Sequence, residues 1–400
     1  MIDNNSKEFI YRHIGPTEVD QEIMLKEVGY NSLEDLMKNT VPEKILLKDE
    51  LKIEEPLSEN DALKKLKTIS KQNKIFRNFI GMGYYNSFTP NVILRNILEN
   101  PGWYTSYTPY QPEVAQGRLE MLLNFQQLII DLTGMDIANA SLLDEATAAA
   151  EAVGLSQRLD KSNSKKIFVS SSCNPQTIDL IKTRTEPFGL ELIIGNEKSD
   201  LQNISENIVC GVLSYPGTLG DIQDPSESIS QIHKKNGKAI LVCDLLALTR
   251  LKTPAELGAD IAVGSAQRFG IPMGYGGPHA AFFATKEEFK RSMPGRIIGV
   301  SVDRHGKKAY RLSLQTREQH IRRDKATSNI CTAQALLAII SAAFAMYHGP
   351  SGLMKIANRT SSLAKLFADE IKKIGFKILS DHFFDTVTII TKNKTNEIYQ

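Results

Sequence analysis

Residues 239–244 read Ala-Ile-Leu-Val-Cys-Asp, a run of apolar residues that ends on a carboxylate. A short apolar run of this kind is typical of a strand that is buried on both faces of a sheet. Similar β-prone runs occur on both sides of it, at 167–169, 192–194, 208–213, 261–263 and 280–284. Helical patterns separate several of these runs, so the sequence predicts an α/β fold with a mainly parallel sheet.

Helices are expected before and between these runs. Asn174 is placed to cap a helix that has Pro175 in its first turn. Further helical patterns cover residues 114–133, where Gly134 is the expected stop, 147–159 and 227–235. The two helices that precede the first strand are expected to pack on the sheet.

The amino-terminal part differs from this α/β pattern. Residues 1–70 read as a helical extension, in which Thr17 and Asp20 begin a helix and Gly29 ends it. Residues 71–348 are then predicted to form the large α/β domain.

The pattern restarts after Gly-Pro-Ser-Gly at 349–352 with an amphipathic helix, followed by an alternating strand at 386–391. Residues 349–400 are therefore predicted to begin a small α+β domain. Another helix starts at 395–399, and two regular elements offer little surface to cover one another. We therefore expect the polypeptide to continue beyond Gln400.

Composition excludes several classes of protein. Lys and Arg number 48 against 46 Asp and Glu, and the net charge of +2 provides no general attraction to nucleic acid or anionic membrane. The four cysteines lie far apart without metal-ligand spacing, and we expect most to be reduced and buried. No apolar run reaches the roughly 18 residues of a membrane helix, and no targeting peptide is evident. These features favour a cytoplasmic protein.

Asp244 is the carboxylate that follows the strand at 239–243. In parallel sheets, ligands bind beyond the carboxyl ends of the strands. A carboxylate there can hold the protonated ring nitrogen of a cofactor such as pyridoxal phosphate (PLP) and keep the ring electron-poor. A helix cap or a solvated turn accounts for the same residue equally well.

A glycine-rich loop, Gly-Ser-Ala-Gln-Arg-Phe-Gly-Ile-Pro-Met-Gly-Tyr-Gly-Gly-Pro at 264–278, joins two predicted strands. Glycine lets the backbone approach a ligand closely. The loop contains no Lys, which excludes a P-loop, and Gly-Met-Gly at 81–83 lacks the third glycine of a dinucleotide fingerprint. The loop is as consistent with a tight structural connection as with a site.

Two further clusters are candidate binding surfaces. Residues 103–113 hold the single Trp, three Tyr and two Pro, which suits a cleft wall, an interface or core packing. Residues 317–325 combine Arg, Lys and His with Glu and Asp. That combination favours either recognition of a carboxylate or acidic partner or a solvated helical face.

Together these stretches resemble the glycine cleavage system P-protein family, the PLP-dependent glycine decarboxylases. The resemblance runs from end to end and is carried by Arg-His-Ile-Gly-Pro at 12–16, Tyr-Thr-Pro-Tyr-Gln-Pro-Glu at 107–113, the loop at 264–278, Thr-Arg-Glu-Gln-His-Ile-Arg-Arg at 316–323 and Thr-Ser-Asn-Ile-Cys-Thr at 327–332. It implies a PLP-dependent transferase fold of the aspartate aminotransferase type, fold type I. The family has two homologous halves, fused or separate, and this chain resembles the amino-terminal half.

The resemblance also implies a reaction and partners. Glycine is decarboxylated on PLP, which acts as the electron sink, and an aminomethyl group passes to the lipoyl arm of H-protein. The implied partners are a PLP-bearing carboxyl-terminal half, glycine and lipoylated H-protein, in a dimeric or heterotetrameric assembly.

This chain departs from the family pattern at the cofactor anchor. In the carboxyl-terminal half of the family a His-Lys pair supplies the amine for the Schiff base, whereas Gln267-Arg268 stands here. A guanidinium with a pKa above about 12 cannot serve as that amine. The turn Leu-Asp-Glu-Ala-Thr at 143–147 carries two carboxylates where a phosphate cradle is expected, and Lys252 and Lys286 fall elsewhere in the pattern.

We therefore expect no catalytic, cofactor-binding or metal-binding residue in this half, with Asp244 a remnant of a cofactor site and the PLP lysine outside the chain. The favoured role is the half that does not anchor PLP and that shapes the entrance to a shared site. A self-sufficient PLP enzyme with an unrecognised lysine and a non-catalytic scaffold or regulatory subunit stay open. Candidate cleft or interface residues are Tyr107, Tyr110, Gln111, Arg317, His320, Arg322 and Arg323.

Overall fold

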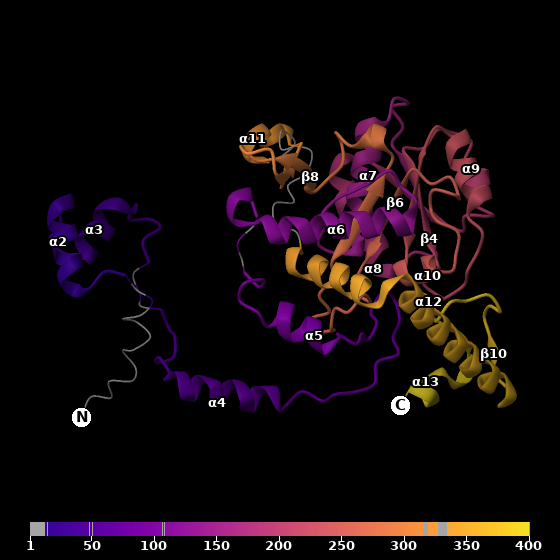
Figure 1. Cartoon of the computed structure of the whole chain (residues 1–400), viewed down its shortest axis with the longest axis horizontal. Coiled ribbons are helices and arrows are strands. Elements are labelled where there is room, and N and C mark those ends of the chain that lie inside the picture. The colour runs from indigo at the N-terminus through magenta and orange to yellow at the C-terminus, as the bar shows by residue number, and fades with distance from the viewer. Residues whose placement is uncertain are drawn as a thin grey trace. The chain divides into compact units, whose positions relative to one another are not determined.

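The computed structural model of the chain describes residues 13, 15–47, 49, 51–105, 107, 109–314, 319–326 and 334–399. The chain forms two compact units, Met1–Arg77 and Asn78–Gln400 (Figure 1). The first unit contains the helices α2 (Glu18–Val28), α3 (Leu33–Thr40) and α4 (Glu59–Ser70).

Helix α2 begins and ends where the sequence predicts. The backbone N–H of Asp20 donates to Thr17 Oγ1 at 3.2 Å, and the backbone N–H of Thr17 donates to Asp20 Oδ2 at 2.9 Å. This reciprocal capping box satisfies two amides that have no partner within the helix. The helix ends at Gly29, whose φ of 82° is the left-handed conformation that glycine adopts without strain.

A seven-stranded sheet in the order β1-β7-β6-β5-β4-β2-β3 is the centre of the second unit. The strands β3, β2, β4, β5 and β6 are parallel, whereas β7 is antiparallel to β6 and β1 is antiparallel to β7. All six predicted strand regions are confirmed. The strands are β1 (Ile137–Ala138), β2 (Lys166–Ser170), β3 (Glu191–Gly195), β4 (Cys210–Tyr215), β5 (Lys238–Cys243), β6 (Ile261–Ser265) and β7 (Ala281–Thr285).

Helices cover both faces of this sheet, which explains why its strands are apolar without alternation. In β5, Ile240 and Val242 pack in the same cluster as α7 (Glu145–Leu159) and α8 (Pro175–Thr185). Leu241 points to the other face, in a cluster with α6 (Gln116–Thr133), α9 (Ser226–Lys234), α10 (Leu245–Leu248) and α12 (Ala335–Lys373). Figure 1 shows α6 and α12 running side by side across the second unit.

The predicted helices around the sheet are confirmed, with one correction to a cap. Asn174 precedes α8 with an extended backbone, but its side chain makes no capping hydrogen bond. Its amide donates instead to Glu145 Oε1 at 3.0 Å. Helix α7 starts two residues before the predicted 147, because Asp144 Oδ1 accepts from the backbone N–H of Thr147 at 2.8 Å.

Helix α12 contains the restart that the sequence indicates. Gly349 has φ 64° and ψ 176°, so two helical segments meet there, and Pro350 opens the second. Among the described residues α12 alone is long and apolar enough to cross a membrane, contrary to the expectation that no apolar run reaches that length. Half of its apolar window is buried, as in the core helices of many globular proteins, so the match is weak evidence for a span.

The remaining elements are short. A hairpin joins β8 (Ile297–Val302) to β9 (Lys308–Ser313), and β10 (Lys377–Ile378) pairs with β11 (Ile389–Ile390). Short helices occur at α5 (Asn91–Ile93), α11 (Gln319–Arg322) and α13 (Thr395–Tyr399), the last of which confirms the predicted terminal helix.

The predicted strand at 386–391 is wrong over most of its length, because only Ile389–Ile390 is a strand. The preceding segment, 382–388, docks on the loop at 217–222 instead. Ile222 N–H donates to His382 O at 2.9 Å, and Thr388 Oγ1 donates to Leu219 O at 2.8 Å. Hydrogen bonds to this distant loop take the place of the strand pairing that the alternating pattern of residues 386–391 predicts.

Candidate functional site

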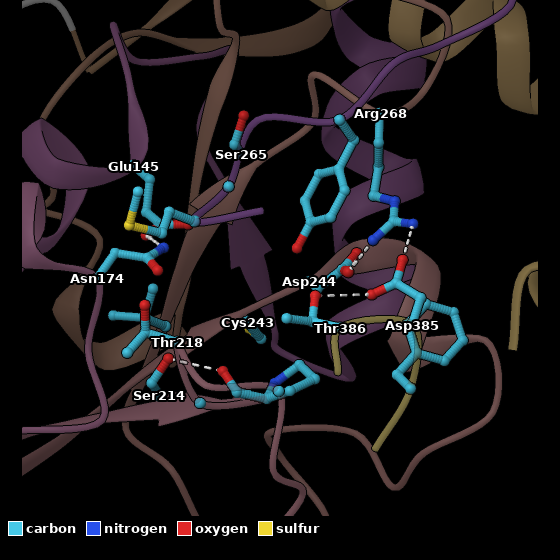
Figure 2. A pocket seen from close by; sticks show the side chains of 18 of the residues that line it. Glu145, Asn174, Ser214, Thr218, Cys243, Asp244, Ser265, Arg268, Asp385 and Thr386 are labelled. Atoms are coloured by element: carbon cyan, nitrogen blue, oxygen red, sulfur yellow. Dashed lines mark hydrogen bonds and ion pairs between the residues drawn. The ribbon is translucent and has the colours of Figure 1, made fainter. Parts of the chain in front are cut away.

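A pocket lies at the carboxyl edge of the sheet, where β4, β5 and β6 end and α7 begins. The space open to the centre of a water-sized sphere is about 50 Å³, which accommodates a few water molecules. Its polar lining includes Tyr85, Glu145, Asn174, Ser214, Thr218, Asp244, Ser265, Gln267, Arg268, Asp385 and Thr386 (Figure 2).

Arg268 occupies one side of this pocket. Its Nη1 pairs with Asp244 Oδ2, and its Nη2 pairs with Asp385 Oδ2. The Tyr85 ring centroid lies 4.0 Å from the guanidinium carbon, which is cation–π distance. Figure 2 shows the guanidinium between the two carboxylates. The planar fork of arginine suits this arrangement, because its nitrogens can bind two acceptors at once.

The charges of this cluster are buried. The side chains of Arg268, Asp244 and Asp385 are only 8%, 13% and 9% exposed. Burial disfavours the charged guanidinium, but the two carboxylates outweigh it and raise the pKa of Arg268. Burial raises the pKa of Asp244, and Asp385 adds to this while Arg268 opposes it. A permanently charged arginine therefore compensates two acidic groups in a buried site.

Asp244 has a second role that agrees with the simpler reading of the sequence. Its Oδ1 accepts from the backbone N–H of Leu246 at 2.9 Å and so caps α10. The residue is thus both a helix cap and an acidic partner of Arg268.

The opposite wall of the pocket is formed by Glu145. Its Oε1 accepts from Asn174 Nδ2 at 3.0 Å and from Thr177 Oγ1 at 3.1 Å. Burial raises the pKa of Glu145, although both hydrogen bonds act in the opposite direction. This carboxyl group lies at the first residue of α7. The amino terminus of a helix attracts anions, so Glu145 occupies a position where a phosphate group would otherwise bind favourably.

The glycine-rich loop lines the pocket and also braces it. Gln267 Nε2 donates to Tyr85 O and to Ile271 O, both at 2.8 Å, and Gln267 Oε1 accepts from the backbone N–H of Tyr85 at 3.3 Å. Ser87 Oγ donates to Arg268 O at 3.2 Å. Gln267, which precedes Arg268 in the sequence, thus holds the segment containing Tyr85 in place.

The residues of this pocket do not fit PLP. The lining side chains of the described chain include no lysine, and Arg268 already occupies the carboxylate that would face the ring nitrogen. Glu145 would repel the phosphate at the start of α7.

Lys252 and Lys286, the two lysines that the sequence analysis considers, do not line the pocket. Lys252 is exposed, and Lys286 Nζ pairs with Asp260 Oδ1 at 2.5 Å beyond the amino end of β6. In the described residues no cluster of His, Cys, Asp and Glu is arranged to hold a metal ion. Cys173, Cys210 and Cys243 are free and buried, as predicted, whereas Cys331 lies outside the described residues.

Tyr107 and Gln111 lie together on a surface outside this pocket. Tyr107 Oη donates to Gln111 Oε1 at 3.1 Å, and Arg118 Nη1 donates to Tyr107 O at 2.9 Å. Tyr110 is partly buried against the core, where its hydroxyl accepts from Arg296. Their proposed part in a cleft or interface stays a prediction.

The basic candidates are described only in part. Arg322 ends α11 and Arg323 follows it, and both are exposed. Arg317 lies outside the described residues, and His320 belongs to α11 without a described side chain. Arg322 and Arg323 are not among the residues that line the pocket, and the role of all four residues stays a prediction.

Tyr85 and Asp385 are pocket residues that the sequence analysis missed. Asp385 lies 117 positions from Arg268, and Tyr85 lies 182 positions from the Gln267 that holds it. Neither residue follows a strand or belongs to a motif, so no local signal marks them.

A family model described as the glycine cleavage system P-protein matches residues 11–400. The chain belongs to the glycine cleavage system P-protein family. It is 74% identical over 400 residues to a glycine dehydrogenase (decarboxylating) of Pelagibacter ubique (strain HTCC1062), covering 100% of this chain and 42% of that protein. A glycine dehydrogenase (decarboxylating) of Psychromonas ingrahamii is 56% identical over 396 residues, with 99% and 41% covered. The chain thus spans about two fifths of the length of these relatives.

Solved structures agree with this membership. A crystal structure of glycine decarboxylase (P-protein) of the glycine cleavage system, in inhibitor-bound form, superposes with a TM-score of 0.84 at 36% identity, covering 92% of this chain and 85% of that one. An aspartate aminotransferase from Thermus thermophilus superposes with a TM-score of 0.55 at 14% identity, covering 79% and 83%. The second likeness shows the fold alone, which is the predicted fold type I architecture.

Proposed function

We propose that this chain is the amino-terminal half of a glycine decarboxylase and that it does not anchor the cofactor. Arg268 carries the second part of this proposal, because it pairs with the strand-end carboxylate Asp244 and no lysine lines the pocket. The length of the relatives supports the first part, since this chain matches only 42% of a glycine dehydrogenase (decarboxylating).

In the complete enzyme, PLP would supply the electron sink for loss of carbon dioxide from glycine. The lysine that holds PLP would lie in the carboxyl-terminal part, and lipoylated H-protein would accept the aminomethyl group. This half would contribute a rigid α/β scaffold beside the working site. Its pocket, which has Arg268 and Glu145 on its walls, would hold no PLP.

Borohydride trapping in the complete protein tests this division. We expect reduction in the presence of PLP to label one lysine beyond residue 400 and none within residues 1–400, because the pocket offers no lysine. Peptide mapping by mass spectrometry locates the label, and glycine-dependent release of carbon dioxide with lipoylated H-protein measures activity.

Two results would contradict the proposal. A stoichiometric PLP adduct on a lysine within residues 1–400 would make this half a self-sufficient PLP enzyme. Full decarboxylation by the carboxyl-terminal part without this half would make it a scaffold or regulatory subunit.

A further inference from the structure

A serine and a histidine lie within hydrogen-bond distance of each other beside this pocket. Ser265 Oγ is 2.6 Å from His279 Nδ1. Ser265 is the last residue of β6 and lines the pocket, where Figure 2 labels it. His279 lies shortly before β7 begins. The turn made by the glycine-rich loop between these two strands therefore brings a nucleophilic hydroxyl group and an imidazole together.

The backbone around the two residues is fixed by strand pairing. β6 and β7 are antiparallel neighbours, and Ser265 is paired with Ala281 in their register. The residues that follow Ser265 and His279 are also joined, because the backbone N–H of Ala266 donates to Ala280 O at 2.7 Å. Groups held by strands keep their separation more precisely than groups on loops. The contact between Ser265 and His279 is thus positioned by the sheet.

The hydrogen bonds of Ser265 favour its hydroxyl group as the donor to His279. The backbone N–H of Gln267 donates to Ser265 Oγ at 3.2 Å and so uses one lone pair of this oxygen. His279 Nδ1 is then the acceptor within reach of the hydroxyl proton. A serine that donates to a neutral imidazole can pass its proton to that base while it attacks an electrophile.

His279 lies in a buried environment that keeps its ring neutral. The residue is 9% exposed, and its Nε2 has no hydrogen-bond partner among the described residues. The rings of His279 and Tyr84 meet edge to face, with centroids 5.1 Å apart. Burial lowers the pKa of His279, and the charge of Asp144 acts in the opposite direction. Near neutral pH the imidazole is therefore uncharged, and its Nδ1 is able to accept a proton.

Ser214 offers a comparison within the same pocket. It also lines the pocket, but its Oγ donates to Pro216 O at 2.7 Å. A backbone carbonyl oxygen accepts a hydrogen bond without taking up the proton, so this contact does not activate the hydroxyl group. The two serines thus differ in the partner that receives the hydroxyl proton.

We propose that Ser265 and His279 are a nucleophile and its base, and that Ser265 accepts a small acyl group from an uncharged activated ester. Ser265 Oγ attacks the carbonyl carbon of the ester while its proton passes to His279 Nδ1. A bond forms between Oγ and the acyl carbon, and the bond from that carbon to the leaving oxygen breaks. His279 then returns the proton to the leaving oxygen.

The charges of the pocket determine which acyl donors are suitable. Three carboxyl groups line it, those of Glu145, Asp244 and Asp385, and Arg268 is the single cationic side chain in the lining. This excess of acidic groups repels anionic donors such as acyl phosphates and favours uncharged esters. Both members of the pair belong to residues 1–400, so the inference does not depend on the proposed function.

Methanesulfonyl fluoride, a small uncharged reagent that sulfonylates activated serines, tests the pair in the complete protein. Attack by Oγ releases fluoride, and peptide mapping by mass spectrometry locates the methanesulfonyl group. We expect Ser265 to be labelled about 100-fold faster than Ser214, which is the scale of assistance from a positioned base. Equal labelling of the two serines, or no labelling of Ser265, would overturn the proposal. This comparison uses the unmodified protein, so no folding defect of a variant can affect it.

The variant His279→Asn separates proton transfer from the hydrogen bond. An asparagine amide can still bond to Ser265 Oγ but does not take up a proton. We expect labelling of Ser265 to slow by about 100-fold, while the labelling of Ser214 and the circular dichroism stay as in the parent. If Ser265 reacted at the parent rate in this variant, its contact with His279 would be structural only and the proposal would be wrong.

Transfer of an acetyl group is measured with p-nitrophenyl acetate. We expect a burst of p-nitrophenolate from the parent and an acetyl group on the peptide that contains Ser265. Ser265→Ala should lose both, and Ser214→Ala should keep both. The same burst from Ser265→Ala as from the parent would refute acyl transfer at this site.

Discussion

Arg268 determines what the pocket can do. Lysine and arginine are both cationic, but only an amine can lose its proton and attack a carbonyl carbon. The guanidinium keeps its charge and holds Asp244 and Asp385 at the same time. At this position the chain therefore has a structural link between residues that are far apart in sequence and no reactive amine.

Removing the cation should be costly. Arg268→Met leaves Asp244 and Asp385 buried without a positive partner, and we expect the free energy of unfolding to fall by about 3–5 kcal/mol. Urea unfolding followed by circular dichroism measures the loss. The triple variant Arg268→Met/Asp244→Asn/Asp385→Asn should recover most of it, because no charge then stays buried. If Arg268→Met were as stable as the parent, the ion pairs would contribute nothing.

Glu145 should make stability depend on pH. Burial raises its pKa in the folded chain above the ordinary value of 4.5, so the folded state binds the proton more tightly than the unfolded state. The associated stability is fully present below pH 4.5 and is lost as the pH rises through the folded pKa. Glu145→Gln keeps the oxygen that accepts from Asn174 and Thr177 and should escape this loss.

The measurement is urea unfolding of both proteins from about pH 4 to pH 8. The stability of Glu145→Gln relative to the parent should increase with pH across this range. Glu227→Gln, an exposed change on α9, is the control and should track the parent. A difference between Glu145→Gln and the parent that does not vary with pH would show that the two states bind this proton equally.

At the scale of elements, the contact between the segment 382–388 and the loop 217–222 secures the small carboxyl-terminal region. The docked segment delivers Asp385 to Arg268. Gly220 makes the approach possible, because its φ is 91° and a Cβ there would collide with the carbonyl oxygen of Thr386.

Gly220→Ala should therefore separate these two elements. Backbone strain alone costs about 1–3 kcal/mol, and the collision adds to it. Gly306→Ala is a matched control, since Gly306 has a φ of 77° with no atom within 4 Å of an added Cβ. Hydrogen exchange of residues 382–388 should accelerate in Gly220→Ala beyond any change in Gly306→Ala. Equal exchange in the two variants would mean that the close approach is unimportant.

Elements that depend on nearby residues in the sequence are predicted correctly. Each central strand is an apolar run because helices cover both its faces, and the cap at Thr17 involves a residue only three positions away. The prediction of a strand at 386–391 was wrong because the conformation of this segment depends on contacts with a loop about 170 positions earlier. The alternation of apolar and polar residues within a segment gives no information about such distant contacts.

At the scale of the whole molecule, the sequence predicted the fold and the pocket edge but only part of the pocket. Asp244 and Arg268 follow strands, where the parallel sheet places ligand-binding residues. Tyr85 precedes all strands of the sheet and Asp385 follows α12, and only folding brings them to Arg268. Pocket residues that are distant in sequence from the strand ends, such as these two, belong to no recognisable motif.

The surroundings of Arg268 mean that a single substitution to lysine would not create a cofactor site. A lysine at 268 alone would still share the pocket with Glu145, whose carboxylate would repel a phosphate group. Asp244 and Asp385 would also lose the guanidinium group that now binds both of them. A Schiff-base site at this position would therefore need several changes at once, and no single substitution supplies it.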